Sequence, residues 1–179
     1  IFTDDQGYGD LSCFGSKTIK TPNIDRIAKE GRKFTSFMVA SPVCTPSRAA
    51  LLTGIYPVHT GMQYGILTSN DPWGLPTEYK LLPEYLKAAG NYTTHLVGKW
   101  HLKSPPKGYL KHMTVKGQGK YFDPTFNGSE GTINKKGYSS DVYTDLALDW
   151  LKNRNRDKPF LLSLQFKAPH HDYGHANRY

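Results

Sequence analysis

A cysteine beside a short predicted helix is the first place where this sequence indicates chemistry. Cys44-Thr45-Pro46-Ser47-Arg48 leads directly into Ala49–Gly54. The pattern predicts a helix that opens on Pro46, which has no N–H to lose, and closes at Gly54. Cys44 then lies where unpaired backbone N–H groups form an anion site, and Arg48 adds a fixed positive charge. A buried structural cysteine is the alternative interpretation.

Two further segments combine side chains that suit an anion or a metal ion. Asp4 and Asp5 are adjacent carboxylates, which favour a hard cation such as Ca²⁺ or Mg²⁺, although such pairs also serve as helix caps and turn residues. Lys99 and His101 project to the same side if their segment is extended. An ammonium and an imidazole would there converge on one anion. The alternative is a surface lysine and a core histidine.

The histidines near the end of the chain are candidates for proton transfer. His170 follows a predicted buried strand, and a histidine titrates near neutrality and can protonate a leaving group. His171 and His175 compete for this role, and spacing does not separate the three. We interpret His59 and His95 as structural. A zinc site is disfavoured because the sequence has no C-x-x-C or H-x-x-x-H element.

Alternating strands and helices must position these side chains. We expect strands at 1–2, 32–40, 93–97 and 159–166, helices at 21–31, 46–54, 81–90 and 140–153, and an irregular segment at 105–136. This order predicts an α/β fold with a mainly parallel sheet sandwiched by helices. Reactive groups in such sheets lie beyond the carboxyl ends of the strands. The three charged segments should therefore meet at one sheet edge.

Length and charge narrow the classes of function. A chain of 179 residues builds one core, and no apolar run has the length of a membrane span. The net charge is +8, and six lysines with no acidic residue lie between Lys99 and Lys120. That run is either a solvated loop or a surface that attracts a polyanion. No nucleic-acid motif is present, so we expect no nucleic-acid partner. The two cysteines, Cys13 and Cys44, make at most one disulfide, so the framework of a disulfide-rich secreted domain is absent.

These segments, in this order, resemble the type I, formylglycine-dependent sulfatases of the alkaline-phosphatase superfamily. The matching stretches are 3–10, 21–25, 44–54, 98–102 and 167–170. The resemblance implies that residues 1–179 are the N-terminal part of a sulfatase catalytic domain. The chain starts without a methionine and ends without a closing element, so we interpret it as a piece of a longer protein. Later metal ligands, a second sulfate-binding lysine and a C-terminal subdomain would lie outside it, and we expect these residues alone to be inactive.

The resemblance also implies the cofactors. Asp4 and Asp5 match ligands of Ca²⁺, with Mg²⁺ as the alternative. Cys44 matches the residue that is oxidised to formylglycine (3-oxoalanine), and it is the third residue that this chain contributes to the metal site. The hydrated aldehyde offers two hydroxyl groups, one of which attacks sulfur.

Four further residues have roles that the resemblance implies. Arg48 matches the residue that stabilises formylglycine, and Lys99 matches the lysine that binds sulfate. His101 matches the histidine that takes the proton of the second hydroxyl, so that sulfate leaves and the aldehyde returns. His170 matches the histidine on the leaving-group side.

The substrate class also follows from resemblance. Residues 117–124, with the helix at 140–153, are similar to bacterial glycan sulfatases related to N-acetylglucosamine-6-sulfatase. This implies a sulfated carbohydrate as substrate, a formylglycine-generating maturation enzyme as partner, and a periplasmic or secreted location. One alternative is a phosphoester or phosphonate hydrolase of the same superfamily, because sulfate and phosphate are both tetrahedral. Another is a non-catalytic binder of sulfated glycans.

Overall fold

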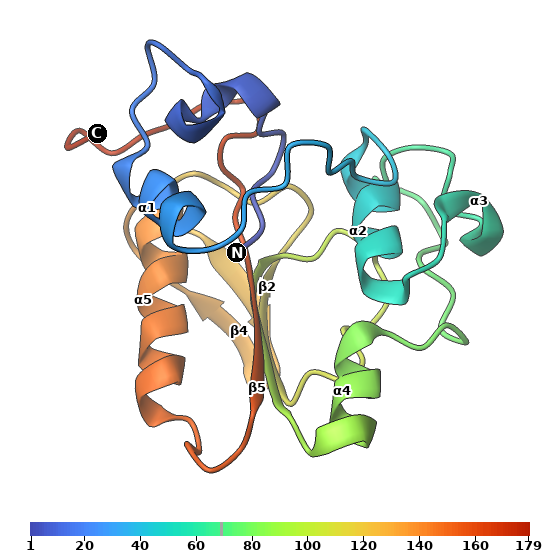
Figure 1. Cartoon of the computed structure of the whole chain (residues 1–179). Coiled ribbons are helices and arrows are strands. Elements are labelled where there is room, and N and C mark those ends of the chain that lie inside the picture. Colours follow the sequence, from blue (N-terminus) through green and yellow to red (C-terminus); the bar gives the residue numbers. More distant parts are fainter. Residues whose placement is uncertain (69) are drawn as a thin grey trace.

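The computed structural model describes residues 1–68 and 70–179. The strands are β1 (Thr93–Lys99), β2 (Lys111–Val115), β3 (Thr125–Gly128), β4 (Gly131–Asn134) and β5 (Phe160–Gln165). The helices are α1 (Pro22–Glu30), α2 (Cys44–Thr53), α3 (Pro57–Thr60), α4 (Leu82–Gly90) and α5 (Ser139–Asn153), with 3₁₀ turns at Tyr8–Asp10 and Ser12–Phe14. The strands form one sheet in the order β4-β3-β2-β1-β5, with helices on both faces (Figure 1).

The centre of the sheet is parallel and one edge is antiparallel. β1 pairs in parallel with β2 and β5, and Phe2 forms a parallel bridge to Gln165. β3 and β4 are antiparallel. The predicted α/β class is therefore confirmed. The expectation of an irregular segment at 105–136 is wrong, because β2, β3 and β4 lie within it. Its many glycine and lysine residues concealed a hairpin in which Phe126 is fully buried.

β1 is buried on both faces of the sheet. Its successive side chains point to opposite sides, and each side packs into a different core. Leu96 belongs to a core with Ala49 of α2, and Val97 belongs to a second core with Tyr143 of α5. Figure 1 shows α5 on one side of the sheet and α2 and α4 on the other. Packing from both faces fixes the place where β1 ends, and with it the residues that follow.

Helix α2 starts two residues earlier than expected. Cys44 is its first residue and Val43 its N-cap, so Cys44 lies in the helix rather than before it. Pro46 is tolerated in this first turn because the N–H groups there have no partner within the helix. Gly54 closes the helix with a left-handed φ of 71°, as expected.

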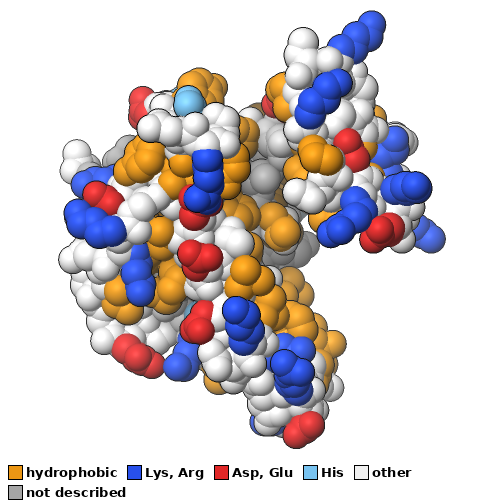
Figure 2. All heavy atoms as spheres, turned by 90° about the vertical axis from the view of Figure 1, so that its left-hand side faces the viewer, with side chains coloured by type: hydrophobic (Ala, Val, Ile, Leu, Met, Phe, Trp, Pro, Cys, Tyr) orange, Lys and Arg blue, Asp and Glu red, His pale blue; other side chains and the backbone are white. Residues whose placement is uncertain are grey.

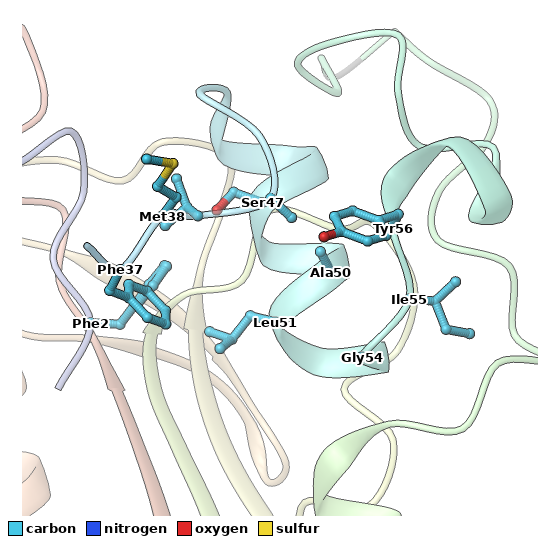
Figure 3. A pocket seen from close by; sticks show the side chains of 11 residues that line it. Phe2, Phe37, Met38, Ser47, Ala50, Leu51, Gly54, Ile55 and Tyr56 are labelled. Carbon is cyan, nitrogen blue, oxygen red and sulfur yellow. The ribbon is translucent and has the colours of Figure 1, made fainter. Parts of the chain in front are cut away.

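The expected strand at 32–40 is wrong. The segment is irregular, and the exposed fractions are 62% for Phe34, 75% for Phe37 and 85% for Met38. Together with Leu51 of α2, part of this segment lines a hollow of about 340 Å³ (Figure 3). No acidic, basic or thiol side chain lines the hollow.

The lysine run does not form one continuous cationic surface. Lys99 is completely buried, whereas Lys107 and Lys111 form ion pairs with Glu84 and Glu130 at 3.6 and 3.3 Å. Basic and acidic side chains are interspersed on the face shown in Figure 2. Among the described residues, no helix combines the length and apolar character that crossing a membrane requires.

Candidate active site

The N-terminal segment is attached to β5 and to the loop after it. The Phe2 N–H donates to the Leu164 carbonyl at 2.8 Å, and the Phe166 N–H donates to the Phe2 carbonyl at 2.9 Å. The Asp4 N–H then donates to the carbonyl of Ala168 at 3.1 Å. Because β1 is parallel to β5, the three charged segments meet at the carboxyl end of the sheet, as the sequence predicts.

Asp4 is the centre of a buried charged cluster. Only 3% of Asp4 is exposed, and its Oδ2 accepts a hydrogen bond from Lys99 Nζ while its Oδ1 lies 3.4 Å from Arg48 Nη2. Arg48 Nη1 also donates to the Lys99 main-chain carbonyl at 2.6 Å and to Gln165 Oε1 at 3.0 Å. Burial lowers the pKa of Lys99 and of Arg48, and the negative charge of Asp4 opposes that shift. Arg48 thus joins α2 to the ends of β1 and β5.

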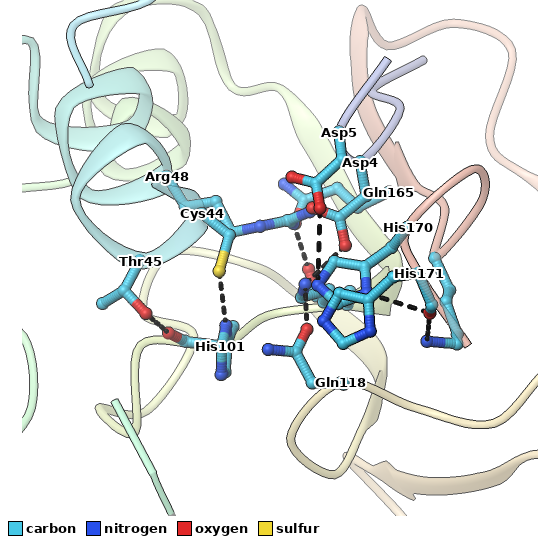
Figure 4. A network of polar contacts seen from close by, with 12 residues as sticks. Asp4, Asp5, Cys44, Thr45, Arg48, His101, Gln118, Gln165, His170 and His171 are labelled. Carbon is cyan, nitrogen blue, oxygen red and sulfur yellow. Dashed lines mark hydrogen bonds and ion pairs between the residues drawn. The ribbon is translucent and has the colours of Figure 1, made fainter. Parts of the chain in front are cut away.

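Cys44 faces His101. Its Sγ lies 3.2 Å from His101 Nδ1, and Thr45 Oγ1 donates to the His101 carbonyl at 3.4 Å (Figure 4). The assumption of an extended segment here is wrong, because β1 ends at Lys99 and His101 has a left-handed φ of 57°. Burial and the charge of Lys99 lower the pKa of His101 to about 4. The imidazole is therefore neutral at pH 7 and is able to accept a proton.

His170 lies on the other side of the site. It is 3% exposed, and its Nε2 is 3.6 Å from Asp5 Oδ2. Tyr121 Oη donates to the His170 carbonyl at 2.6 Å, which holds the loop. His171 and His175 are exposed. Of the three competing histidines, His170 is the buried one that faces Asp5.

The carboxylates of Asp4 and Asp5 are suitable ligands for a hard cation. With Gln6 and Cys44 they line one cavity of about 320 Å³. Their oxygen atoms are the donors that Ca²⁺ and Mg²⁺ prefer. Within residues 1–68 and 70–179, however, no three His, Cys, Asp or Glu side chains are grouped as a metal site. The chain therefore offers two carboxylates and not a complete set of ligands. Cys44 is a free thiol, as is Cys13.

Of the two histidines interpreted as structural, the buried His95 fits that interpretation. His95 is 4% exposed, contacts the Lys111 carbonyl through Nδ1 at 3.0 Å and stacks on Trp150 at 5.1 Å between ring centroids. His59 is exposed.

Sequence reasoning missed two glutamines of the site. Gln165 accepts from Arg48, and Gln118 accepts from Lys99 Nζ. A signal was present in both cases. Gln165 is polar at the end of the apolar strand β5, and Gln118 stands between two glycines.

Comparison with known proteins assigns the family. The model of the family described as Sulfatase matches residues 1–179. This chain belongs to the sulfatase family. It is 37% identical over 182 residues to the N-acetylglucosamine-6-O-sulfatase of Bacteroides thetaiotaomicron, a match that covers 100% of this chain and 31% of the relative. The chain thus spans about a third of the length of that sulfatase.

Solved structures agree on the fold. A structure determined in complex with its substrate, D-glucosamine-2-N,6-O-disulfate, superposes with a TM-score of 0.90 at 36% identity, over 99% of this chain and 35% of the other. The structure of Ps i-CgsB in complex with k-i-k-neocarrahexaose gives a TM-score of 0.87 at 31% identity, over 94% and 44% of the two chains. The mixed sheet flanked by helices is thus an alkaline-phosphatase-like α/β fold shared with solved sulfatase-family relatives.

Proposed function

We propose that the protein containing this chain hydrolyses sulfate esters of carbohydrates through a formylglycine made from Cys44. The observation that carries the proposal is the contact of 3.2 Å between Cys44 Sγ and the neutral imidazole of His101, next to the buried ammonium of Lys99. A nucleophile, a proton acceptor and an anion-binding cation are thereby close together. The amino-sugar sulfate named for one structural relative supports a 6-sulfated amino sugar as substrate.

The proposed cofactor is Ca²⁺, with Mg²⁺ as the alternative, held by Asp4 and Asp5 beside residue 44. When present, the cation and the formylglycine supply a hydroxyl nucleophile for sulfur and positive charge for the sulfate oxygens. The cavity of about 320 Å³ that these three residues line together supports this assignment. The missing ligands would come from beyond residue 179, so we expect these residues alone to be inactive.

Four side chains of this chain would stabilise charge, transfer protons or position the site. Lys99 neutralises sulfate oxygens as negative charge develops, and its burial strengthens that interaction. His101 takes a proton at Nδ1 from a hydroxyl group on residue 44. His170, oriented by Asp5 at 3.6 Å, gives a proton to the departing alcohol oxygen. Arg48 holds the end of β1 in place through the Lys99 carbonyl.

We further propose a formylglycine-generating maturation enzyme as partner and a periplasmic or secreted location. The intact motif from Cys44 to Arg48 supports the first. Two sequons, Asn91-Tyr92-Thr93 and Asn127-Gly128-Ser129, are relevant only in a eukaryotic secretory route.

The test uses the full-length protein coexpressed with a maturation enzyme. Peptide mass spectrometry across residue 44 should show formylglycine, and 4-nitrophenyl sulfate should be hydrolysed faster than 4-nitrophenyl phosphate. An unmodified thiol in an active enzyme would overturn the mechanism. Equal or faster phosphate turnover would instead assign a phosphoester hydrolase. Binding of sulfated glycans without any turnover would assign a non-catalytic binder.

A further inference from the structure

We propose that Gln118 is a further residue of the site, which fixes the ammonium of Lys99 through one end of its amide and donates to the sulfated substrate through the other. This inference rests on the proposed function, because it concerns how the same site holds its substrate. Neither the sequence motifs nor the family resemblance assigns a role to Gln118.

The orientation of the amide follows from its partner. Lys99 Nζ is a donor without acceptor capacity, so the atom of Gln118 that faces it is Oε1. Asp4 Oδ2 accepts a second N–H of the same ammonium. Two of the three N–H bonds of Lys99 are thus directed to Gln118 and Asp4. The third is the one that we assign to a sulfate oxygen.

The Nε2 group of Gln118 consequently points away from Lys99. Figure 4 shows it turned to the side of the picture on which His101 lies. Gln118, His101 and Trp100 line the same cavity of about 720 Å³. This volume has the size of ordinary small-molecule sites, so it has room for a sugar ring. The amide therefore offers a donor to whatever occupies the cavity next to His101.

The backbone around Gln118 is built to present this side chain. Gly117 and Gly119 both have positive φ, 55° and 72°, which is easy only for glycine. The Gly119 N–H donates to the Lys116 carbonyl at 3.1 Å and closes the turn. A Cβ on Gly119 would lie 2.9 Å from Val115 Cγ2, so a larger residue would displace the turn.

The neutrality of the amide matters as much as its geometry. The charge of Lys99 is already balanced by Asp4. A carboxylate at position 118 would still accept from Lys99, but it would lose the donor and add a negative charge that repels sulfate. A glutamine satisfies Lys99 without that repulsion. Replacement by glutamate therefore keeps the hydrogen bond with Lys99 and removes the donor to the substrate, so the two roles can be tested separately.

The experiment compares Gln118→Glu and Gln118→Leu with the matched control Gln63→Glu in the full-length protein. Gln63 is exposed and lines none of the cavities described above. Binding of inorganic sulfate is measured by isothermal titration calorimetry, and kcat and KM are measured with 4-nitrophenyl sulfate. Both Gln118 variants should lose sulfate affinity and kcat/KM by about 10- to 100-fold. Gln63→Glu should equal the wild type.

The melting temperature of Gln118→Glu should stay within a few degrees of the wild type, because its contact with Lys99 persists. Wild-type sulfate affinity in Gln118→Glu would overturn the proposal, since a merely structural contact predicts that result. If the wild type binds sulfate but hydrolyses no sulfate ester, the proposed function fails. The sulfate titration then still decides the role of Gln118. Absence of sulfate binding to the wild type would overturn both.

Discussion

His101 Nδ1 lies 3.2 Å from the Sγ atom of Cys44, across 57 positions of the chain. The contact joins the first residue of α2 to a left-handed residue just after β1. Because the imidazole is neutral at pH 7, it is ready to take a proton from a group on residue 44. The proposed nucleophile and the proposed base therefore lie on two different elements, each of which packs against the core.

Replacing Cys44 tests the nucleophile directly. In the full-length protein, Cys44→Ala should lower kcat for an aryl sulfate by about a thousandfold or more, because no hydroxyl nucleophile is made at this position. The matched control is Cys13→Ala, since Cys13 lines neither the cavity of Asp4 and Asp5 nor that of Gln118. Both variants should unfold at similar temperatures. Substantial aryl sulfatase activity in purified Cys44→Ala would exclude this cysteine as the precursor of the nucleophile.

Removal of divalent cations from the full-length protein should abolish its activity, and added Ca²⁺ should restore it. Asp5→Asn should weaken Ca²⁺ binding by about tenfold or more, because affinity depends on the number of charged ligands. Asp5 should contribute strongly because the charge of Asp4 is offset by Lys99 and Arg48. Calcium titration calorimetry measures the effect, with the exposed Asp157→Asn as control. Equal calcium affinity in the two variants would argue against Asp5 as a ligand.

Lys99 is also important for stability. Lys99→Met should reduce the free energy of unfolding by about 3 kcal/mol, since it removes a buried hydrogen bond to Asp4 Oδ2 and leaves Asp4 with only the longer contact to Arg48. Lys111→Met removes an exposed pair with Glu130 and should have no measurable effect. Urea denaturation provides both values. Similar losses in the two variants would contradict the burial of the Asp4 cluster.

Gly98 is required where β1 and β5 approach each other. Its φ is 110°, and a Cβ there would lie 1.9 Å from the Gln165 carbonyl oxygen. Gly98→Ala should therefore destabilise the fold by about 3 kcal/mol or more. A Cβ on Gly9 would meet no heavy atom within 4 Å, so Gly9→Ala is the control. Differential scanning calorimetry should show a large drop in melting temperature for the first variant alone.

Stability should fall as the pH decreases from about 6.5 to 4. Burial lowers the pKa of His95 to about 4, so over this range the unfolded chain binds a proton that the folded chain does not. The stabilisation is complete above the unfolded pKa, and up to about 3 kcal/mol is lost by pH 4. His95→Gln should flatten the pH dependence of urea unfolding, and the exposed His59→Gln should not. The pKa of His101 is also lowered to about 4, so part of the pH dependence of stability should remain in His95→Gln. An unchanged pH slope in His95→Gln would disprove the assignment.

Much of the fold was predictable because strong local signals agreed with the packing. The helices α1, α4 and α5 and the strands β1 and β5 occur where caps and apolar runs predict them. The strand expected at 32–40 is wrong because its apolar side chains face solvent and have no neighbouring strand among the described residues. Alternation of apolar residues does not reveal whether a partner strand is available.

The residues of the site that belong to recognisable sequence motifs could be predicted. Sequence order placed Asp4, Lys99 and His170 at one sheet edge, as the parallel pairing confirms. The positions of Gln118 and Gln165 carried a sequence signal, but the partners of their amides and the left-handed conformation of His101 were not predictable. They depend on backbone direction and on neighbours far away in the sequence.

The contacts of Arg48 also have a consequence for the order in which parts of the site are formed during synthesis. Its guanidinium group contacts the Lys99 carbonyl 51 positions away and Gln165 117 positions away. Domains form while a chain is being synthesised from its N-terminus, so α2 is made long before its last anchor exists. During that interval residue 44 is not yet enclosed against the ends of β1 and β5. The maturation enzyme that we propose would therefore have access to Cys44 in the period of synthesis before β5 is made.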